Sequence, residues 1–122
     1  MICLFLSSNY NFDKLKKGIQ DSIKLNFKEC IDYSEGSIVS KIVIKQPKGN
    51  ATLFAFDEGE ELSEHTAPFD ALVQIIDGES KVKVGEQTHH LISGESILMP
   101  ANVPHALKAE TKFKMLLTMI RE

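Results

Sequence analysis

From Phe27 onward, short runs of alternating apolar and polar residues are separated by turn residues. The runs that predict strands are SIVSKIVIK, ATLFAF, ALVQII, SKVKV, QTHHLI, ESILMP, HALKA and FKMLLTMI. A period of two residues with many β-branched and aromatic side chains is typical of strands. PKGN, Asp77-Gly78, Gly85-Glu86 and Ser93-Gly94 lie between the runs, and we expect Asp77-Gly78 to form a two-residue hairpin turn. The pattern predicts an all-β antiparallel sandwich or barrel.

The first residues follow a different period. Apolar side chains recur at helical spacing at Phe12, Leu15, Ile19 and Ile23. This spacing predicts a short amphipathic helix over residues 12–25 that packs on the main body or on a second subunit. The alternative is a poorly ordered tail. We therefore divide the chain into an N-terminal extension with a short helix, residues 1–26, and a β-barrel, residues 27–122.

Length and charge narrow the classes of function. The 122 residues are enough for one ordinary domain, and the net charge of −3 gives no basic field for a nucleic acid. The opening MICLFL is far shorter than the roughly 20 residues that span a bilayer, and it lacks the basic residues of a signal peptide. We expect a cytoplasmic protein that binds neither nucleic acid nor membrane.

Histidines are the main candidates for chemistry. His65 precedes the run ALVQII, and His105 opens the run HALKA. The starts of these two strands can meet at one mouth of a barrel made of two sheets. Two imidazoles alone make a weak metal site, because zinc sites use at least three protein ligands and non-haem iron sites commonly add a carboxylate.

A third ligand is hard to find in the sequence. Side chains alternate across a strand, so Glu64, Asp70 and Gln74 are expected to point away from the interior. His89 and His90 are adjacent, so at most one of them can point inward. The alternative for these two is that they are surface histidines at a strand end.

Two segments resemble the conserved motifs of the cupin superfamily. The first cupin motif has a glycine, five residues, His-x-His, three or four residues, a glutamate, and a closing glycine. Gly59, His65 and Gly78 match it. The second histidine falls on Ala67, and the glutamate falls on Ala71, or on Leu72 with the longer spacing.

The second cupin motif has a glycine, five residues, a proline, and a loop that ends in histidine. Gly94, Pro100 and His105 match it, and the resemblance extends over about residues 35–120. Within the superfamily the chain is similar to small single-domain cupins whose first motif reads HTAPFDA. The resemblance implies a conical antiparallel barrel, a double-stranded β-helix of the jelly-roll type, with a pocket at one end. It also implies a homodimer.

The resemblance has further implications for the site. Metal-bearing cupins use four motif ligands for iron, manganese, zinc or nickel, and this chain keeps only His65 and His105 of the four. We therefore expect no metal or a weakly bound divalent ion at these two histidines. The expected pocket is lined by both histidines and by four further residues: Ala67, Ala71, Phe69 and Met99. For Phe69 and Met99, packing in the core is the alternative role.

Three hypotheses for function follow. The first is a binding or regulatory module with a vacated metal site, whose small-molecule ligand carries an anionic or hydrogen-bonding group. The second is an enzyme, an isomerase or dioxygenase-like protein that acts on a small sugar or keto compound through a metal or a histidine base. The third is a structural role in which Phe113, Met115, Leu117 and Met119, which share one strand face, form a dimer contact. Packing inside the barrel explains that face equally well.

Overall fold

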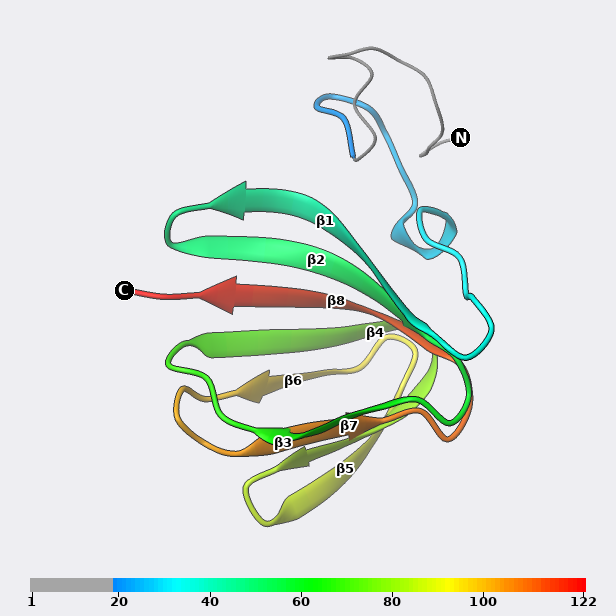
Figure 1. Cartoon of the computed structure of the whole chain (residues 1–122). Helices are drawn as coiled ribbons and strands as arrows, with labels where there is room; N and C mark the ends of the chain where they lie inside the picture. The colour runs from blue at the N-terminus through cyan, green and yellow to red at the C-terminus, as the bar shows by residue number, and fades with distance from the viewer. Residues whose placement is uncertain (1–18) are drawn as a thin grey trace.

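The structure, a computed structural model, describes residues 19–122. Within them the regular elements are all strands apart from one 3-10 turn (Figure 1). The elements are a 3-10 turn, η1 (Phe27–Glu29), and the strands β1 (Ile38–Gln46), β2 (Gly49–Phe56), β3 (Glu61–His65), β4 (Asp70–Val84), β5 (Gln87–Ile92), β6 (Ser96–Met99), β7 (His105–Lys108) and β8 (Phe113–Ile120). The predicted all-β antiparallel fold is confirmed.

The strands form two antiparallel sheets that share β4. The first sheet has the order β1-β2-β8-β4-β6, and the second has the order β3-β7-β4-β5. Figure 1 shows the sheets joined where β4 bends, at the right, and separated at the left, where β3 ends and β7 begins. The two histidine-bearing strand ends therefore lie at the open end of the fold.

The predicted hairpin at Asp77-Gly78 is wrong, because β4 continues through it as one strand. The register of β4 with β8 shifts between Ile75 and Asp77, which marks a bulge. Gly78 has a φ of 75°, and a Cβ placed there would lie 2.0 Å from the carbonyl oxygen of Lys112. The glycine thus allows β8 to approach the bend closely, and the bend carries β4 from one sheet into the other.

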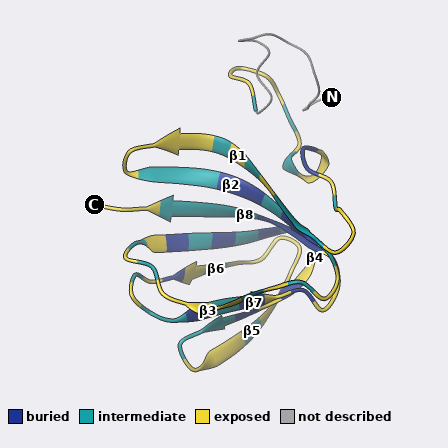
Figure 2. Cartoon of the chain, viewed as in Figure 1, coloured by how far each residue is buried: buried dark blue, intermediate teal, exposed yellow. Residues whose placement is uncertain are grey.

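The main core lies between the two sheets (Figure 2). Phe113 and Met115 are fully buried there, and the ring of Phe56 stacks on that of Phe113 with centroids 4.4 Å apart. Leu117 and Met119 pack against the same core and are half-buried. Interior packing therefore explains this face of β8, and the hypothesis that it forms a dimer contact is wrong.

A second, smaller core lies on the outer face of the first sheet. Leu53 and Ala55 of β2 are buried there beneath Cys30 and Ile31. Since Phe56 of the same strand points into the main core, β2 is buried on both faces. The segment before β1 thus acts as a cover for one part of the sheet.

This covering segment is not the helix that its spacing predicted. Residues 19–25 contain a turn and irregular backbone, and Ser22 has a φ of 63°, which a right-handed helix cannot accommodate. Ile19 and Leu25 instead pack against the second, smaller core on the outer face of the first sheet. The helix is wrong for residues 19–25, and its remaining residues, 12–18, lie outside the described part of the chain.

Polar contacts fix the covering segment to the bend of β4. The hydroxyl of Tyr33 donates a hydrogen bond to Asp77 Oδ2 at 2.6 Å, and Lys114 Nζ donates to the carbonyl of Lys28 at 2.6 Å. The hydrogen bond from Tyr33 lowers the pKa of Asp77, while burial and the neighbouring carboxylate raise the pKa of Tyr33. Both shifts favour the state in which the tyrosine donates to an ionised carboxylate.

Candidate functional site

Strand β3, which the sequence pattern did not predict, brings the two motif histidines together. β3 pairs with β7, and His65 lies directly opposite His105 in the register. Their Nε2 atoms are 3.1 Å apart, and the rings meet edge to face with centroids 4.3 Å apart. The expectation that the two strand ends meet is therefore fulfilled by direct contact of the imidazoles.

The other nitrogen of each ring faces a backbone carbonyl. His65 Nδ1 is 2.8 Å from the carbonyl oxygen of Ser63, and His105 Nδ1 is 3.2 Å from that of Val103. A carbonyl oxygen only accepts, so each Nδ1 must carry a hydrogen for its contact to be a hydrogen bond. Two neutral imidazoles then have no hydrogen left for the contact between the Nε2 atoms.

The pair is therefore one hydrogen short in its neutral form. One added proton makes the Nε2 contact a charge-assisted hydrogen bond, and the pair then carries a charge of +1. His65 is exposed, whereas His105 is buried. Burial lowers the pKa of His105, the carbonyl of Val103 opposes this effect, and charge on His65 adds to it. Burial thus disfavours a charge on the ring of His105.

Two loops hold this end of the site. In the β6–β7 loop, the backbone N–H of Asn102 donates to the carbonyl of Ala67 at 2.8 Å, and that of Ala101 donates to Asp70 Oδ1 at 2.9 Å. Asn102 adopts a φ of 65°, a conformation that asparagine tolerates better than most residues. The loop leading into His105 is thus tied to the β3–β4 loop that follows His65.

The two expected wall residues differ in their environment. Met99 is buried in the main core opposite Ala71, so the packing alternative holds for it. Phe69 is half-buried, and the guanidinium carbon of Arg121 lies 5.3 Å from the centre of its ring. Arg121 was not among the predicted site residues, because no local pattern links the end of β8 to the β3–β4 loop.

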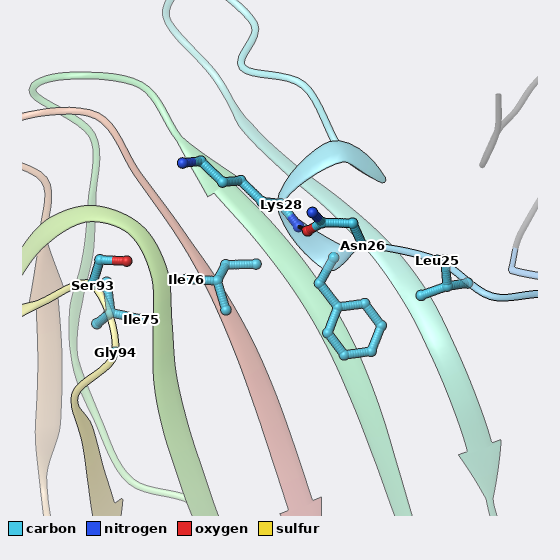
Figure 3. A pocket seen from close by; sticks show the side chains of 8 residues that line it. Leu25, Asn26, Lys28, Ile75, Ile76, Ser93 and Gly94 are labelled. Carbon is cyan, nitrogen blue, oxygen red and sulfur yellow. Dashed lines mark hydrogen bonds between the residues drawn. The ribbon is translucent and has the colours of Figure 1, made fainter.

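A groove of about 580 Å³ lies elsewhere, on the outer face of the first sheet. It runs between the η1 region and the β5–β6 turn (Figure 3). Its lining consists of Leu25, Asn26, Phe27, Lys28, Ile75, Ile76, Ser93 and Gly94. None of the six predicted ligand-binding residues lines it.

Comparison with known proteins decides the family. The model of a family described as the cupin domain matches residues 52–121, more than half of the chain. The chain belongs to the cupin family. No curated protein matches this cupin.

Solved structures agree with the assignment. A conserved protein of unknown function from Streptococcus pyogenes is 28% identical with a TM-score of 0.82, over 87% of this cupin and 93% of that chain. A cupin 2 conserved barrel domain protein from Leptotrichia buccalis is 44% identical with a TM-score of 0.77, over 80% of this cupin and 47% of that chain. This cupin thus spans about half the length of the Leptotrichia protein. A cupin superfamily protein from Desulfitobacterium hafniense is 25% identical with a TM-score of 0.81, over 87% and 97% of the two chains.

The structure shows which residue of this cupin occupies the glutamate position of the first motif. Ala71 is buried in the main core, whereas Leu72 pairs with Leu98 and Thr118 on the outer face of the first sheet. Ala71 is therefore the position that faces the interior, and Leu72 is not. Ala67, the position of the lost histidine, is half-buried in the loop after His65.

No third donor joins the two histidines within residues 19–122. Glu64 forms an ion pair with Lys83 on the outer side of the second sheet, as strand alternation predicts. His89 lies opposite the buried Val82 and so shares its inward face, and His90 pairs with Glu79. In this described range no group of three His, Cys, Asp or Glu side chains could hold a metal ion.

The residues present therefore do not fit the four-ligand metal centre of the family. The Nε2 separation of 3.1 Å is close to the ~3.3 Å expected of two nitrogens bound to one ion at tetrahedral angles. The other two positions, Ala67 and Ala71, offer only methyl groups.

Residues 19–122 also contain no helix of the length and apolarity needed to cross a membrane.

Proposed function

We propose that this cupin reversibly binds a small organic acid between its two sheets, at the open end where His65 and His105 meet. The observation that carries the proposal is the contact of their Nε2 atoms at 3.1 Å, for which two neutral rings with hydrogen on Nδ1 have no donor. At neutral pH such an acid is present as its carboxylate, so the pair takes up the missing hydrogen from solvent as the carboxylate binds. The imidazolium so formed then faces the carboxylate, and a charge-assisted contact replaces an unfavourable contact between two acceptors.

The remaining walls suit an apolar body. Phe54, Leu117 and Met119 point between the sheets, yet they are only half-buried. Ala67 and Ala71 add methyl groups where metal-binding relatives carry polar ligands. A short hydrocarbon chain with one carboxyl group matches this combination of surfaces.

We further propose that the protein holds any divalent ion only weakly. Two imidazoles without an anionic ligand lack the charge and the number of donors that stable sites use. Loss of outer hydrogen-bond partners alone costs 10- to 100-fold in affinity at metal sites, and here two direct ligands are absent. Elemental analysis of protein purified without an affinity tag tests this statement, and a stoichiometric tightly bound metal would contradict it.

Catalysis is the second hypothesis, and the contacts of the histidines do not favour it. Both Nδ1 atoms contact backbone carbonyls, so neither ring has the carboxylate partner that commonly orients a histidine base. A binding role needs no such partner.

The cytoplasmic location also stays a prediction.

Nuclear magnetic resonance of the imidazole nitrogens tests the proposed binding. Butyrate is the probe, and butyramide, which has the same length but no acid group, is the matched control. We expect butyrate to shift the ring resonances of both motif histidines and butyramide to leave them unchanged. His65→Ala and His105→Ala abolish the response, whereas His90→Ala, on the outer side of the second sheet, retains it. Equal shifts with both compounds, or with none of a series of short carboxylates, would overturn the proposal.

A further inference from the structure

The row of residues that holds the histidine pair continues across the second sheet to a further polar residue. His105 lies opposite His65 on β3 and opposite Val84 on β4. Val84 in turn lies opposite Gln87, the first residue of β5. Residues directly opposite each other in antiparallel strands point to the same face, so Gln87 shares the inner face with both histidines. Since the turn between β4 and β5 lies at the open end of the fold (Figure 1), Gln87 stands at the mouth of the proposed pocket.

His89 follows on the same face of β5, one step further from the mouth. It lies opposite Val82, which is fully buried, and the next residue on its face, Leu91, is buried in the main core. Alternation therefore directs the ring of His89 between the sheets. His89 is only half-buried, so it borders the open space. Among residues 19–122 the side chains of Gln87 and His89 have no hydrogen-bond partner, and both can therefore contact a ligand.

The charges of this sheet point away from the open space. Lys81 and Lys83 form their ion pairs on the outer side. Of the described residues on the inner face of β4 and β5, none is a lysine or an arginine. A second carboxylate would therefore find no permanent cation there. An amide and a neutral imidazole each offer a donor and an acceptor, and a hydroxyl can use both, so Gln87 and His89 suit a neutral hydroxyl.

The spacing of the strands sets the length of a ligand that reaches both polar ends. β5 lies two strands from β7, which is about 10 Å, and His89 is set back from the mouth by two residues, or about 7 Å. The backbone positions of His105 and His89 are therefore roughly 12 Å apart. A four-carbon acid with a terminal hydroxyl is about 5 Å long from its carboxyl carbon to that hydroxyl, and hydrogen bonds at both ends extend its reach to roughly 11 Å. An acid of this length spans the two polar ends.

We propose that Gln87 and His89 bind a hydroxyl at the far end of the ligand, so that this cupin prefers a short straight-chain hydroxy acid to a plain fatty acid. This preference rests on the proposed acid site and adds a second recognised group to it. The carboxylate lies at the histidine pair, and the hydroxyl takes the place of water at His89. The second sheet thus supplies both polar ends of the pocket, and the first sheet supplies the apolar wall between them.

Two acids of equal length test this preference. 4-Hydroxybutyrate differs from pentanoate only in that a hydroxyl replaces the terminal methyl group. A purely apolar pocket binds pentanoate more tightly, because burial favours the methyl group and the hydroxyl loses its contacts with water. We expect the opposite of the wild type. Its dissociation constant for 4-hydroxybutyrate, from titrations followed by the imidazole nitrogen resonances, should be about three- to tenfold lower than that for pentanoate.

Substitutions on β5 identify the residues that contact the hydroxyl. His89→Leu replaces the ring by an apolar side chain, and we expect this variant to prefer pentanoate. Gln87→Leu should reduce the preference for 4-hydroxybutyrate, and both variants should still bind pentanoate. His90→Leu is the matched control, because His90 is adjacent in the chain but pairs with Glu79 on the outer side, and it should keep the wild-type preference. Circular dichroism confirms that each variant is folded.

The results distinguish the hydroxyl contact from the acid site itself. Wild-type protein that binds pentanoate as tightly as 4-hydroxybutyrate, or more tightly, would overturn the hydroxyl contact and leave the acid site standing. A preference for 4-hydroxybutyrate that persists in His89→Leu would also overturn it. Failure of both acids to bind would overturn the proposed function, and the preference with it.

Discussion

Restoring the two missing ligands should convert this protein into a metal-binding cupin. The double variant Ala67→His with Ala71→Glu adds an imidazole and a carboxylate to the existing histidine pair. Ala71 faces the interior and lies opposite both Met99 and Met119, so a glutamate at this position points toward the space between the sheets. The variant has the four donors that a stable site needs.

The metal-free variant should be less stable than the wild type. Ala71 is 4% exposed, and enlarging a side chain in a packed core costs about 1–3 kcal/mol before the burial of charge is counted. With a total cost of about 3 kcal/mol, the melting temperature falls by roughly 10 °C for a domain of this size. Zinc at 1,000 times its dissociation constant returns about 4 kcal/mol, which offsets the loss.

Thermal unfolding followed by circular dichroism, with and without zinc, measures both effects. Ala67→His with Ala71→Gln is the matched control, since glutamine has nearly the same volume as glutamate but no charge. We expect zinc to raise the melting temperature of the glutamate variant by roughly 10 °C or more and that of the control much less. A folded glutamate variant that zinc does not stabilise would refute the reasoning, and so would an equal response of the wild type.

Two further predictions concern the bend of β4. Tyr33→Phe removes the hydrogen bond to Asp77, and we expect a loss of about 1.5 kcal/mol in urea unfolding at neutral pH. The pKa of Asp77 is lowered in the folded state, so the stability from this hydrogen bond is present above the unfolded pKa near 3.8 and is lost as the pH falls through the folded pKa. If Tyr33→Phe cost the same at pH 7 and at pH 2.5, this prediction would be contradicted. Gly78→Ala forces a Cβ to within 2.0 Å of the Lys112 carbonyl oxygen and should cost more than about 2 kcal/mol in the same assay. The control is Gly94→Ala, because Gly94 also has a positive φ but no atom lies within 4 Å of the new Cβ. We expect this control to cost about 1 kcal/mol. Equal losses at both glycines would show that close packing at the bend is unimportant.

Much of the sheet structure could be predicted because alternation is a local property. In runs such as SIVSKIVIK and FKMLLTMI, alternating residues point to opposite faces of the strand, so both faces can be assigned from the sequence. Strand β3 could not be found in this way, since ELSEH has one apolar residue and only its pairing with β7 makes it a strand. Asp77-Gly78 has the local chemistry of a hairpin, but the approach of β8 turns it into a bulge.

The candidate site was predictable in part for a similar reason. The spacing of the cupin motifs located His65 and His105, and strand parity placed Glu64 on the outer side. The sequence could not choose between Ala71 and Leu72, because that choice depends on the register of β4 against β8. The Nδ1 atoms contact backbone carbonyls, and these contacts decide how many hydrogens the pair needs. Every residue has a backbone carbonyl, so such contacts cannot be predicted from the sequence.

The tautomers of the two motif histidines test the central claim most directly. Nitrogen-15 spectra of the ligand-free wild type at neutral pH report which ring nitrogens carry hydrogen. The account predicts hydrogen on Nδ1 of both rings and at most one hydrogen, shared, between the two Nε2 atoms. Hydrogen on Nε2 of either ring with its Nδ1 bare would contradict the account, because the contact between the two Nε2 atoms would then already hold a hydrogen.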